Sequence, residues 1–325
     1  MQLYCPCRIS LRLALLFLLV TSVVLSPGGS KPANAAIGYT GDFLRLGAGG
    51  RALAMGDAFV ALADDATAGY YNPAGLSQVK SSQLLLQHSE RFAGVVKNDF
   101  IAVVIPGKTK QNFAVSLFRI GVDDIKYTKL KDPTEPFDLS GNRPYVSRIA
   151  SAADWVVYLS FGYRMRSGLS TGSTLKLILR KLGGNSAFGY GIDLGFLYSP
   201  LPTVSIGANF SDLLCTPVNW DTGTVDVIMP SARMGLACSW PVALLCGRLT
   251  GTLELRAEKG TGRYNLSLSS GAEYRFRDLL ALRLGSHRGE FTAGAGLRIY
   301  KYVNIDCAFL QQEESSYRVS LTAQF

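Results

Sequence analysis

Apolar and polar residues alternate in short segments from about residue 81 to the end of the chain. Residues 155–165 carry apolar side chains at every odd position, and residues 248–258 separate a polar and an apolar set in the same way. A period of two predicts β-strands with one apolar and one polar face. About fourteen segments of about ten residues are present, and this is the length that a tilted strand needs to cross a bilayer.

The connections between these segments favour a closed membrane barrel over a soluble sandwich, whose strands also alternate. Outer-membrane barrels have short periplasmic turns and longer extracellular loops in alternation. The short connections lie at residues 107–110, 166–170, 199–203, 277–278 and 300–302, and the longer ones at 123–152, 181–188, 213–229 and 311–315. All the longer connections lie on one side of the membrane if the first strand runs outward. Only the connection at 240–246 is longer than this arrangement requires.

The last ten residues form the clearest strand of the chain. Tyr317, Val319, Leu321, Ala323 and Phe325 alternate with polar residues, and Phe325 is the C-terminal residue. A final strand of this kind is the pattern that the bacterial outer-membrane insertion machinery recognises. We therefore expect that machinery and the outer-membrane lipid bilayer to be partners of the protein. Closure of the barrel would also pair the strand edges, which lipid cannot satisfy.

The first 35 residues have the pattern of a secretory signal peptide. Arg8 and Arg12 precede an apolar run at 13–25, and small residues occupy Ala33 and Ala35. This pattern predicts export with cleavage near Ala35, and an uncleaved signal anchor is the alternative. The expected location is the outer membrane of a Gram-negative-type bacterium.

Composition adds little to this picture. Hydrophobic residues make up 48% of the 325 residues, yet no later stretch reaches the roughly 20 apolar residues of a spanning helix. Lys and Arg number 33 against 24 Asp and Glu, but the excess is too dispersed to indicate nucleic-acid binding. The later cysteines fit no metal motif, and a disulfide between Cys238 and Cys246 stays open because export permits one.

Residues 41–78 differ from the strand segments because they are rich in small residues. They include seven glycines and nine alanines, which allow the backbone to turn tightly and to lie close to its surroundings. We interpret residues 36–80 as a compact plug containing short helices, and residues 81–325 as the barrel that surrounds it.

Four motifs of the plug resemble a known family. They are RALAMG at 51–56, AFVA at 58–61, ADDAT at 63–67 and NPAGL at 72–76. They are similar to the N-terminal signature of the PorV/PorQ branch of the FadL-like (OMPP1/FadL/TodX) outer-membrane proteins. The resemblance implies that this segment plugs a 14-stranded barrel.

The same resemblance implies two alternative functions, and neither requires catalysis. FadL-like members import long-chain fatty acids and other hydrophobic molecules. PorV-like members are partners of type IX secretion that bind exported proteins at the cell surface. We expect binding or transport of a hydrophobic small molecule, with a role in a type IX-like system that handles a secreted protein as the alternative.

Charged residues recur on the polar faces of the predicted strands, and we expect these faces to line the barrel interior. The set is Arg164, Lys176, Arg180, Asp193, Arg248, Glu254, Arg256, Glu258, Glu273, Arg275, Arg283, Arg298, Asp306 and Arg318. Such residues are costly against lipid but ordinary in a polar lumen. They could bind the anionic head of an amphiphile or pair with Asp42, Asp57, Asp64 and Asp65 of the plug. Pairing is favoured because structural ion pairs are the commoner reason for such sets.

Two early segments, at 100–105 and 113–120, are apolar on both faces. We expect Ile101, Val103 and Phe118 to face inward, so that either the plug or a hydrophobic ligand must cover them. The candidate ligand-binding residues are Phe43, Leu46, Met55, Phe59, Ile101, Val103 and Phe118.

Asn72, Pro73 and Ala74 lie shortly before the first predicted strand. Pro73 fixes its own φ and disfavours a helical Asn72, whose side chain can cap nearby backbone donors. We interpret the motif as the neck that joins plug to barrel, and a purely structural turn is the alternative.

Enzymatic chemistry has little support in the sequence. His88 precedes Ser89 and Ser286 precedes His287, but neither pair has a carboxylate or an oxyanion loop placed by spacing. No phosphate loop, dinucleotide fingerprint or metal cluster is present in the sequence. We therefore predict a protein that is not an enzyme and has no cofactor.

Overall fold

The computed structural model describes residues 40–325, except for 139–140, 167, 244–245, 260–262 and 312–314. The predicted signal peptide at 1–35 lies outside the described residues. The strands of the wall are β1 (Gln83–Arg91), β2 (Val96–Pro106), β3 (Gln111–Leu130), β4 (Pro144–Arg166), β5 (Leu169–Leu182), β6 (Asn185–Leu201), β7 (Val204–Ser211), β10 (Ser231–Val242), β11 (Gly247–Lys259), β12 (Tyr264–Phe276), β13 (Leu280–His287), β14 (Glu290–Ile299), β15 (Val303–Leu310) and β16 (Ser316–Gln324).

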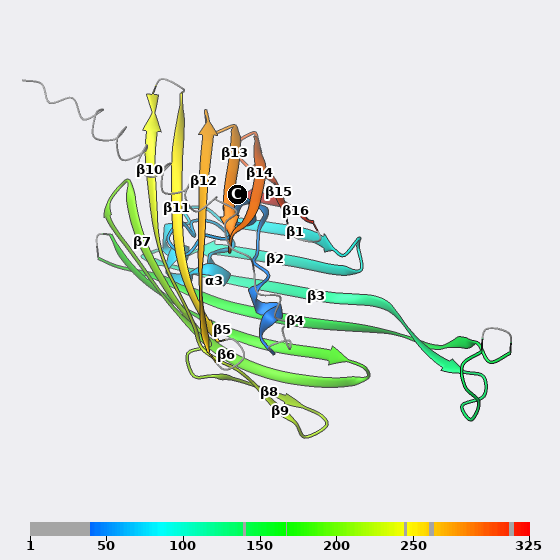
Figure 1. Ribbon diagram of the computed structural model, residues 1–325. Helices are drawn as coiled ribbons and strands as arrows, with labels where there is room; N and C mark the ends of the chain where they lie inside the picture. The colour runs from blue at the N-terminus through cyan, green and yellow to red at the C-terminus, as the bar shows by residue number, and fades with distance from the viewer. Residues whose placement is uncertain (1–39, 139–140, 167, 244–245, 260–262, 312–314) are drawn as a thin grey trace, which may run out of the picture.

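These fourteen strands form one closed antiparallel barrel (Figure 1). Each strand pairs with its neighbours in chain order, β7 pairs with β10, and β1 pairs with β16 to close the sheet. The backbone N–H of Phe325 donates to the Ser82 carbonyl oxygen at 3.0 Å, which ties the end of the chain to the start of the first strand. The predicted all-β barrel of about fourteen strands is confirmed.

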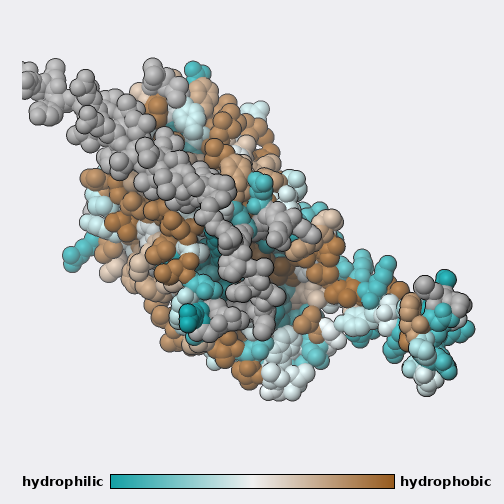
Figure 2. All heavy atoms as spheres, viewed as in Figure 1, coloured by the Kyte–Doolittle hydropathy of each residue, from teal (hydrophilic) through white to brown (hydrophobic). Residues whose placement is uncertain are grey.

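The barrel is apolar outside and polar inside. On β16, the side chains of Tyr317, Val319 and Leu321 are exposed, whereas Arg318 and Ser320 between them are buried. Figure 2 shows apolar side chains over much of the visible barrel exterior. This arrangement is the reverse of a soluble sandwich and is typical of barrels that face lipid.

The plug fills the interior with four short helical turns. They are η1 (Asp42–Arg45), α2 (Gly50–Ala54), α3 (Ala68–Tyr71) and η2 (Pro73–Gln78). Glycines with positive φ precede and follow α2, at Gly49 and Gly56. A positive φ is not helical, so the helix ends at both positions, and glycine stands there because other residues rarely adopt this conformation. Within the described residues, no helix has the length and apolarity needed to span a bilayer.

Two predicted loops contain strands. The predicted connection at 213–229 forms a hairpin of β8 (Thr216–Trp220) and β9 (Val225–Ile228), and β8 pairs with the outer end of β6. The predicted loop at 123–152, here called the arm, continues β3 and β4 as a two-stranded ribbon beyond the wall (Figure 1). Pairing persists there across two bulges, which explains why the alternation of the barrel strands does not continue into the arm.

The prediction for the faces of β2 is wrong. Ile101 is 42% exposed on the outer face, and Val103 lies on the same face, whereas Phe100, Ala102 and Val104 are fully buried inside. Both faces of this strand are apolar, so hydrophobicity could not distinguish lipid from lumen. Phe118 on β3 faces inward, as predicted, and is fully buried.

Candidate functional site

An aromatic cluster covers the apolar inner surface of β2, β3 and β4. The Tyr70 ring lies 6.3 Å from Phe100, 6.4 Å from Phe118 and 5.8 Å from Tyr158, measured between ring centroids. The Tyr70 hydroxyl donates to the Leu44 carbonyl oxygen at 2.7 Å and accepts from a backbone N–H. Tyr70 of the plug therefore occupies the place that the sequence assigned to other plug residues or to a ligand.

The seven candidate ligand-binding residues do not form one pocket. Phe43, Phe59 and Phe118 belong to one buried core, and Leu46 is half-buried against it. Met55 is also fully buried, but its backbone lies against Gly271 and Gly285 of the wall, under β12 and β13. Ile101 and Val103 lie on the outer face of the wall, as described above.

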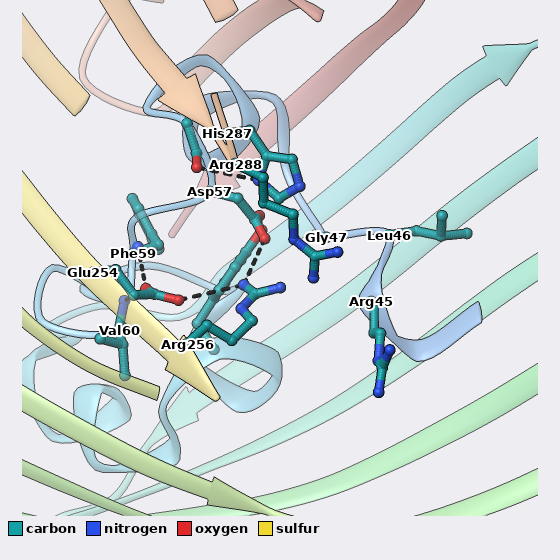
Figure 3. A network of polar contacts seen from close by, with 12 residues as sticks. Arg45, Leu46, Gly47, Asp57, Phe59, Val60, Glu254, Arg256, His287 and Arg288 are labelled. Carbon is teal, nitrogen blue, oxygen red and sulfur yellow. Dashed lines mark hydrogen bonds and ion pairs between the residues drawn. The ribbon is translucent and has the colours of Figure 1, made fainter. Parts of the chain in front are cut away.

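A buried ion pair joins the plug to β11 (Figure 3). A carboxylate oxygen of Asp57 lies 2.8 Å from Nη2 of Arg256, and the Tyr71 hydroxyl donates to the other oxygen. Burial raises the pKa of Asp57, but the charge of Arg256 more than offsets this and holds the pKa well below the usual 3.8. Asp57 is therefore a carboxylate at neutral pH, and its charge is neutralised by the wall.

A second wall residue completes this contact. Glu254, two residues from Arg256 on the same face of β11, accepts from the backbone N–H groups of Phe59 and Val60 at 2.9 and 3.0 Å. Nη2 of Arg256 lies 3.3 Å from a Glu254 oxygen. The Glu254 carboxylate thus accepts hydrogen bonds from two buried backbone N–H groups of the plug that do not belong to a helix.

A third contact holds α2 at the end of the barrel that carries the short turns. Nη1 of Arg51 lies 2.6 Å from Asp64 of the plug, and its Nε lies 3.2 Å from Glu273 of β12. Glu273 also bonds Arg283 at 2.7 Å, and Arg283 bonds Asp306 at 2.7 Å. The inward-facing charges of the wall were expected to form ion pairs, and here they do. Asp64, however, pairs with Arg51 of the plug and not with a residue of the wall.

The motif at residues 72–74, predicted to be the neck that joins plug to barrel, is buried against the wall at β6. The Asn72 amide donates to the carbonyl oxygens of Val60 and Phe196 at 2.8 and 3.0 Å, and its side-chain oxygen accepts from Ala74 N–H at 3.1 Å. A Cβ at Gly195 would lie 2.2 Å from that oxygen. The absence of a side chain on the wall therefore permits Asn72 and Pro73 to lie against it.

Two small spaces lie beside the plug among the described residues. One of about 130 Å³ lies among Arg51, Arg283 and Arg298, and one of about 30 Å³ lies between Tyr70 and Arg233. Arg233 is a functional candidate that the sequence analysis missed. Its guanidinium lies 5.7 Å from the Tyr70 ring centroid, and among the described residues its buried Nη1 has no hydrogen-bond partner. The sequence signal that was available for Arg233 is the alternation along β10, which places Arg233 on the same inward face as Gly235.

His88 and Ser89, one of the two pairs considered for catalysis, lie on opposite faces of β1. His88 is exposed on the outer face of β1, whereas the Ser89 hydroxyl faces inward and donates to the Tyr317 carbonyl oxygen at 2.8 Å.

Cys238 and Cys246 are both free, so no disulfide joins them.

Comparison with solved structures shows a FadL-like barrel fold. The Pseudomonas putida toluene transporter TodX is 15% identical with a TM-score of 0.54, over 86% of this chain and 96% of that one. The CymD monoaromatic hydrocarbon channel is 13% identical with a TM-score of 0.55, over 86% and 98%. A Pseudomonas aeruginosa FadL homologue is 12% identical with a TM-score of 0.51, over 83% and 96%. No curated protein matches the chain.

A family model matches a longer stretch of sequence than the plug motifs alone. The family is described as Uncharacterised protein family (UPF0164), and its model matches residues 30–208. This match covers more than half of the 325 residues, including the plug and the wall from β1 into β7. The chain therefore belongs to the family UPF0164.

Proposed function

We propose that this protein is an outer-membrane channel for hydrophobic small molecules, with the plug as its gate. The observation that carries the proposal is an aromatic column inside a barrel whose outer face is apolar. Phe118 of β3 and Tyr158 of β4 form an apolar inner surface, and Tyr70 of the plug covers it. The fold shared with proteins described as toluene and monoaromatic hydrocarbon channels supports the same proposal.

In this proposal the plug moves when a molecule passes through the barrel. The interior spaces of about 130 and 30 Å³ are too small for a drug-sized ligand, which needs about 300 Å³ or more. The plug is anchored on both sides, because Asp57 is paired with Arg256 of β11 and the Asn112 amide of β3 donates to the Leu76 and Val79 carbonyl oxygens, whereas the Tyr70 ring makes apolar contacts with β2, β3 and β4. Displacement of α3 from this side would expose an apolar path, and it would break the hydrogen bonds of Thr174 to the Gly69 carbonyl oxygen and of Tyr71 to Asp57.

The alternative function is a non-enzymatic role in a type IX-like protein secretion system, as the PorV/PorQ resemblance implies. The arm favours this alternative because it presents apolar side chains on a built support. Asn142 near its tip donates to the carbonyl oxygens of Asp132 and Glu135 at 2.8 and 2.9 Å, and Phe137, which lies between Glu135 and Asn142 in the chain, is 58% exposed. A held loop with an exposed aromatic residue is suited to contact another protein.

The test compares uptake of a labelled long-chain fatty acid by cells with equal amounts of folded protein. Wild-type protein should give uptake above an empty-vector control. Asn72→Ala combined with Pro73→Ala should leave the barrel inserted but change the uptake, because both side chains hold the plug beside β6. Uptake equal to the vector control would reject transport and leave the secretion role, and equal uptake by both proteins would make the motif structural only.

A further inference from the structure

The outer face of the barrel carries an apolar groove that the transport function does not use. The groove has a volume of about 510 Å³ and crosses β16, β1, β2 and β3. Its apolar lining consists of Leu86, Ile101, Leu117, Val319 and Leu321, all on the outer face of the wall. A groove in this position faces the hydrocarbon of a bilayer, so an acyl chain is the occupant that the fold itself supplies.

One end of the groove is bordered by charged side chains of both signs. His88 Nδ1 lies 2.7 Å from Asp99, and the exposed Glu90 lies 3.4 Å from His88 Nε2. Arg119 Nη1 lies 3.6 Å from Asp99, and its Nη2 lies 3.4 Å from Asp123. The carboxylates of Asp99, Glu90 and Asp123 are each more than one third exposed, whereas the Arg119 side chain is 19% exposed at the edge of the groove.

Arg119 retains capacity for a further anionic partner. Its two carboxylate contacts are longer than the 2.7–2.9 Å of a tight charge-assisted hydrogen bond, and a guanidinium has five N–H donors. The guanidinium carbon lies 5.2 Å from the Trp155 ring centroid, so the group is held in place beside the groove. A phosphate at the head of a lipid chain in the groove would meet this cation.

We propose that the groove is a binding site for a zwitterionic phospholipid with a primary amine head, as in phosphatidylethanolamine. The acyl chain lies between Ile101 and Leu321, the phosphate meets Arg119, and the ammonium meets Asp99 and Glu90. A purely anionic head would satisfy Arg119 but would approach three carboxylates, which repel it. A choline head carries the same charges but has no N–H to donate to those carboxylates, so it would bind less well.

Trp155 provides the test because its ring lies at the groove. The chain has three tryptophans, and Trp220→Phe with Trp240→Phe leaves Trp155 as the only one. The purified full-length protein is reconstituted in vesicles that mix brominated phosphatidylethanolamine with plain phosphatidylcholine, and then with the bromine on the other lipid. Bromine quenches tryptophan fluorescence on contact, so the two series give a relative binding constant. We expect the amine lipid to be favoured by about threefold, as is typical for exposed ion pairs.

Two controls separate this site from general contact with lipid. A protein that retains only Trp240, on the outer face of β10, should show no preference between the two head groups. Glu90→Gln combined with Asp99→Asn should abolish the preference at Trp155, whereas Glu135→Gln on the arm should leave it unchanged. Assembly of each variant is checked by heat-modifiable migration in electrophoresis.

Three outcomes would overturn the proposal. These are an equal preference at Trp155 and Trp240, a preference that persists without Glu90 and Asp99, and stronger quenching by brominated phosphatidylglycerol than by the amine lipid. The last result would assign the groove to anionic lipids. All three outcomes are independent of the proposed transport function, because the assay measures lipid contact and not uptake.

Discussion

Arg256→Leu is expected to release the plug from the barrel wall. The substitution leaves the buried carboxylates of Asp57 and Glu254 without the cation that lies between them. Removal of one partner from a buried ion pair typically costs about 3–5 kcal/mol, because the other charge stays buried and uncompensated. The measurement is limited proteolysis of detergent-purified protein, in which the plug should be cleaved while the barrel stays intact.

Arg298→Leu is the matched control for this experiment. Arg298 is also an inward-facing arginine, but the partner of its Nε is Asn304 of the wall, at 2.9 Å. Its loss should leave the plug protected. The same rate of plug cleavage in wild type and in the Arg256 variant would contradict the assigned role of the ion pair.

The same ion pair predicts a dependence on pH. The pKa of Asp57 is lower in the folded protein than its usual 3.8, so its contribution to stability is fully present above that value. The contribution is lost as pH falls below 3.8 toward the folded value. Protection of the wild-type plug should therefore decline in acid, and Asp57→Asn should remove this part of the decline.

Gly195→Val is expected to push the plug away from β6. Even the Cβ of the new residue would lie 2.2 Å from the Asn72 side-chain oxygen and 2.8 Å from Cδ of Pro73. Both residues are buried, so they cannot yield without movement of the plug, and overpacking of this kind costs about 1–3 kcal/mol. We expect a barrel that still migrates as a folded species but whose plug is open to protease.

Gly141→Val on the arm is the control for this substitution. The nearest atom to a Cβ at Gly141 is an Asp138 carboxylate oxygen at 3.6 Å, which is an ordinary contact. This variant should behave as wild type in both assays. If the plug of the Gly195 variant is as protected as that of Gly141→Val, then the close contact with Asn72 does not hold the plug.

The wall could be predicted from the sequence wherever its two faces differ in polarity. On β11 and β16, charged and hydroxyl side chains alternate with apolar ones, and the structure buries the polar set. On β2, the inner Phe100 and Ala102 are as apolar as the outer Ile101, so the pattern carried no information about direction. The inner face is apolar there because it packs on Tyr70, and that contact joins segments 30 residues apart, which periodicity cannot detect.

The plug illustrates a different limit. Its richness in small residues indicated a compact insert, and the structure explains this richness by close backbone contacts with wall glycines such as Gly271 and Gly285. Which plug side chain meets which strand depends on the three-dimensional path of a chain with little regular structure. Arg256 was identified as an inward charge, but its partner could not be chosen among the four acidic residues of the plug.

In the proposed function, hydrophobic molecules pass through the barrel only when the plug moves. A reversible lock tests this requirement most directly, in a protein with Gly69→Cys on α3 and Ser160→Cys on β4. A Cβ at Gly69 would lie 3.1 Å from that of Ser160, slightly closer than the roughly 3.5–4.5 Å of a disulfide, so a small shift of α3 would let the bond form. Uptake of the labelled fatty acid is compared before and after reduction, with each single-cysteine variant as a control. Uptake should stay at the vector level while the lock is oxidised and should recover after reduction. Equal uptake above the vector level in both states would contradict this requirement.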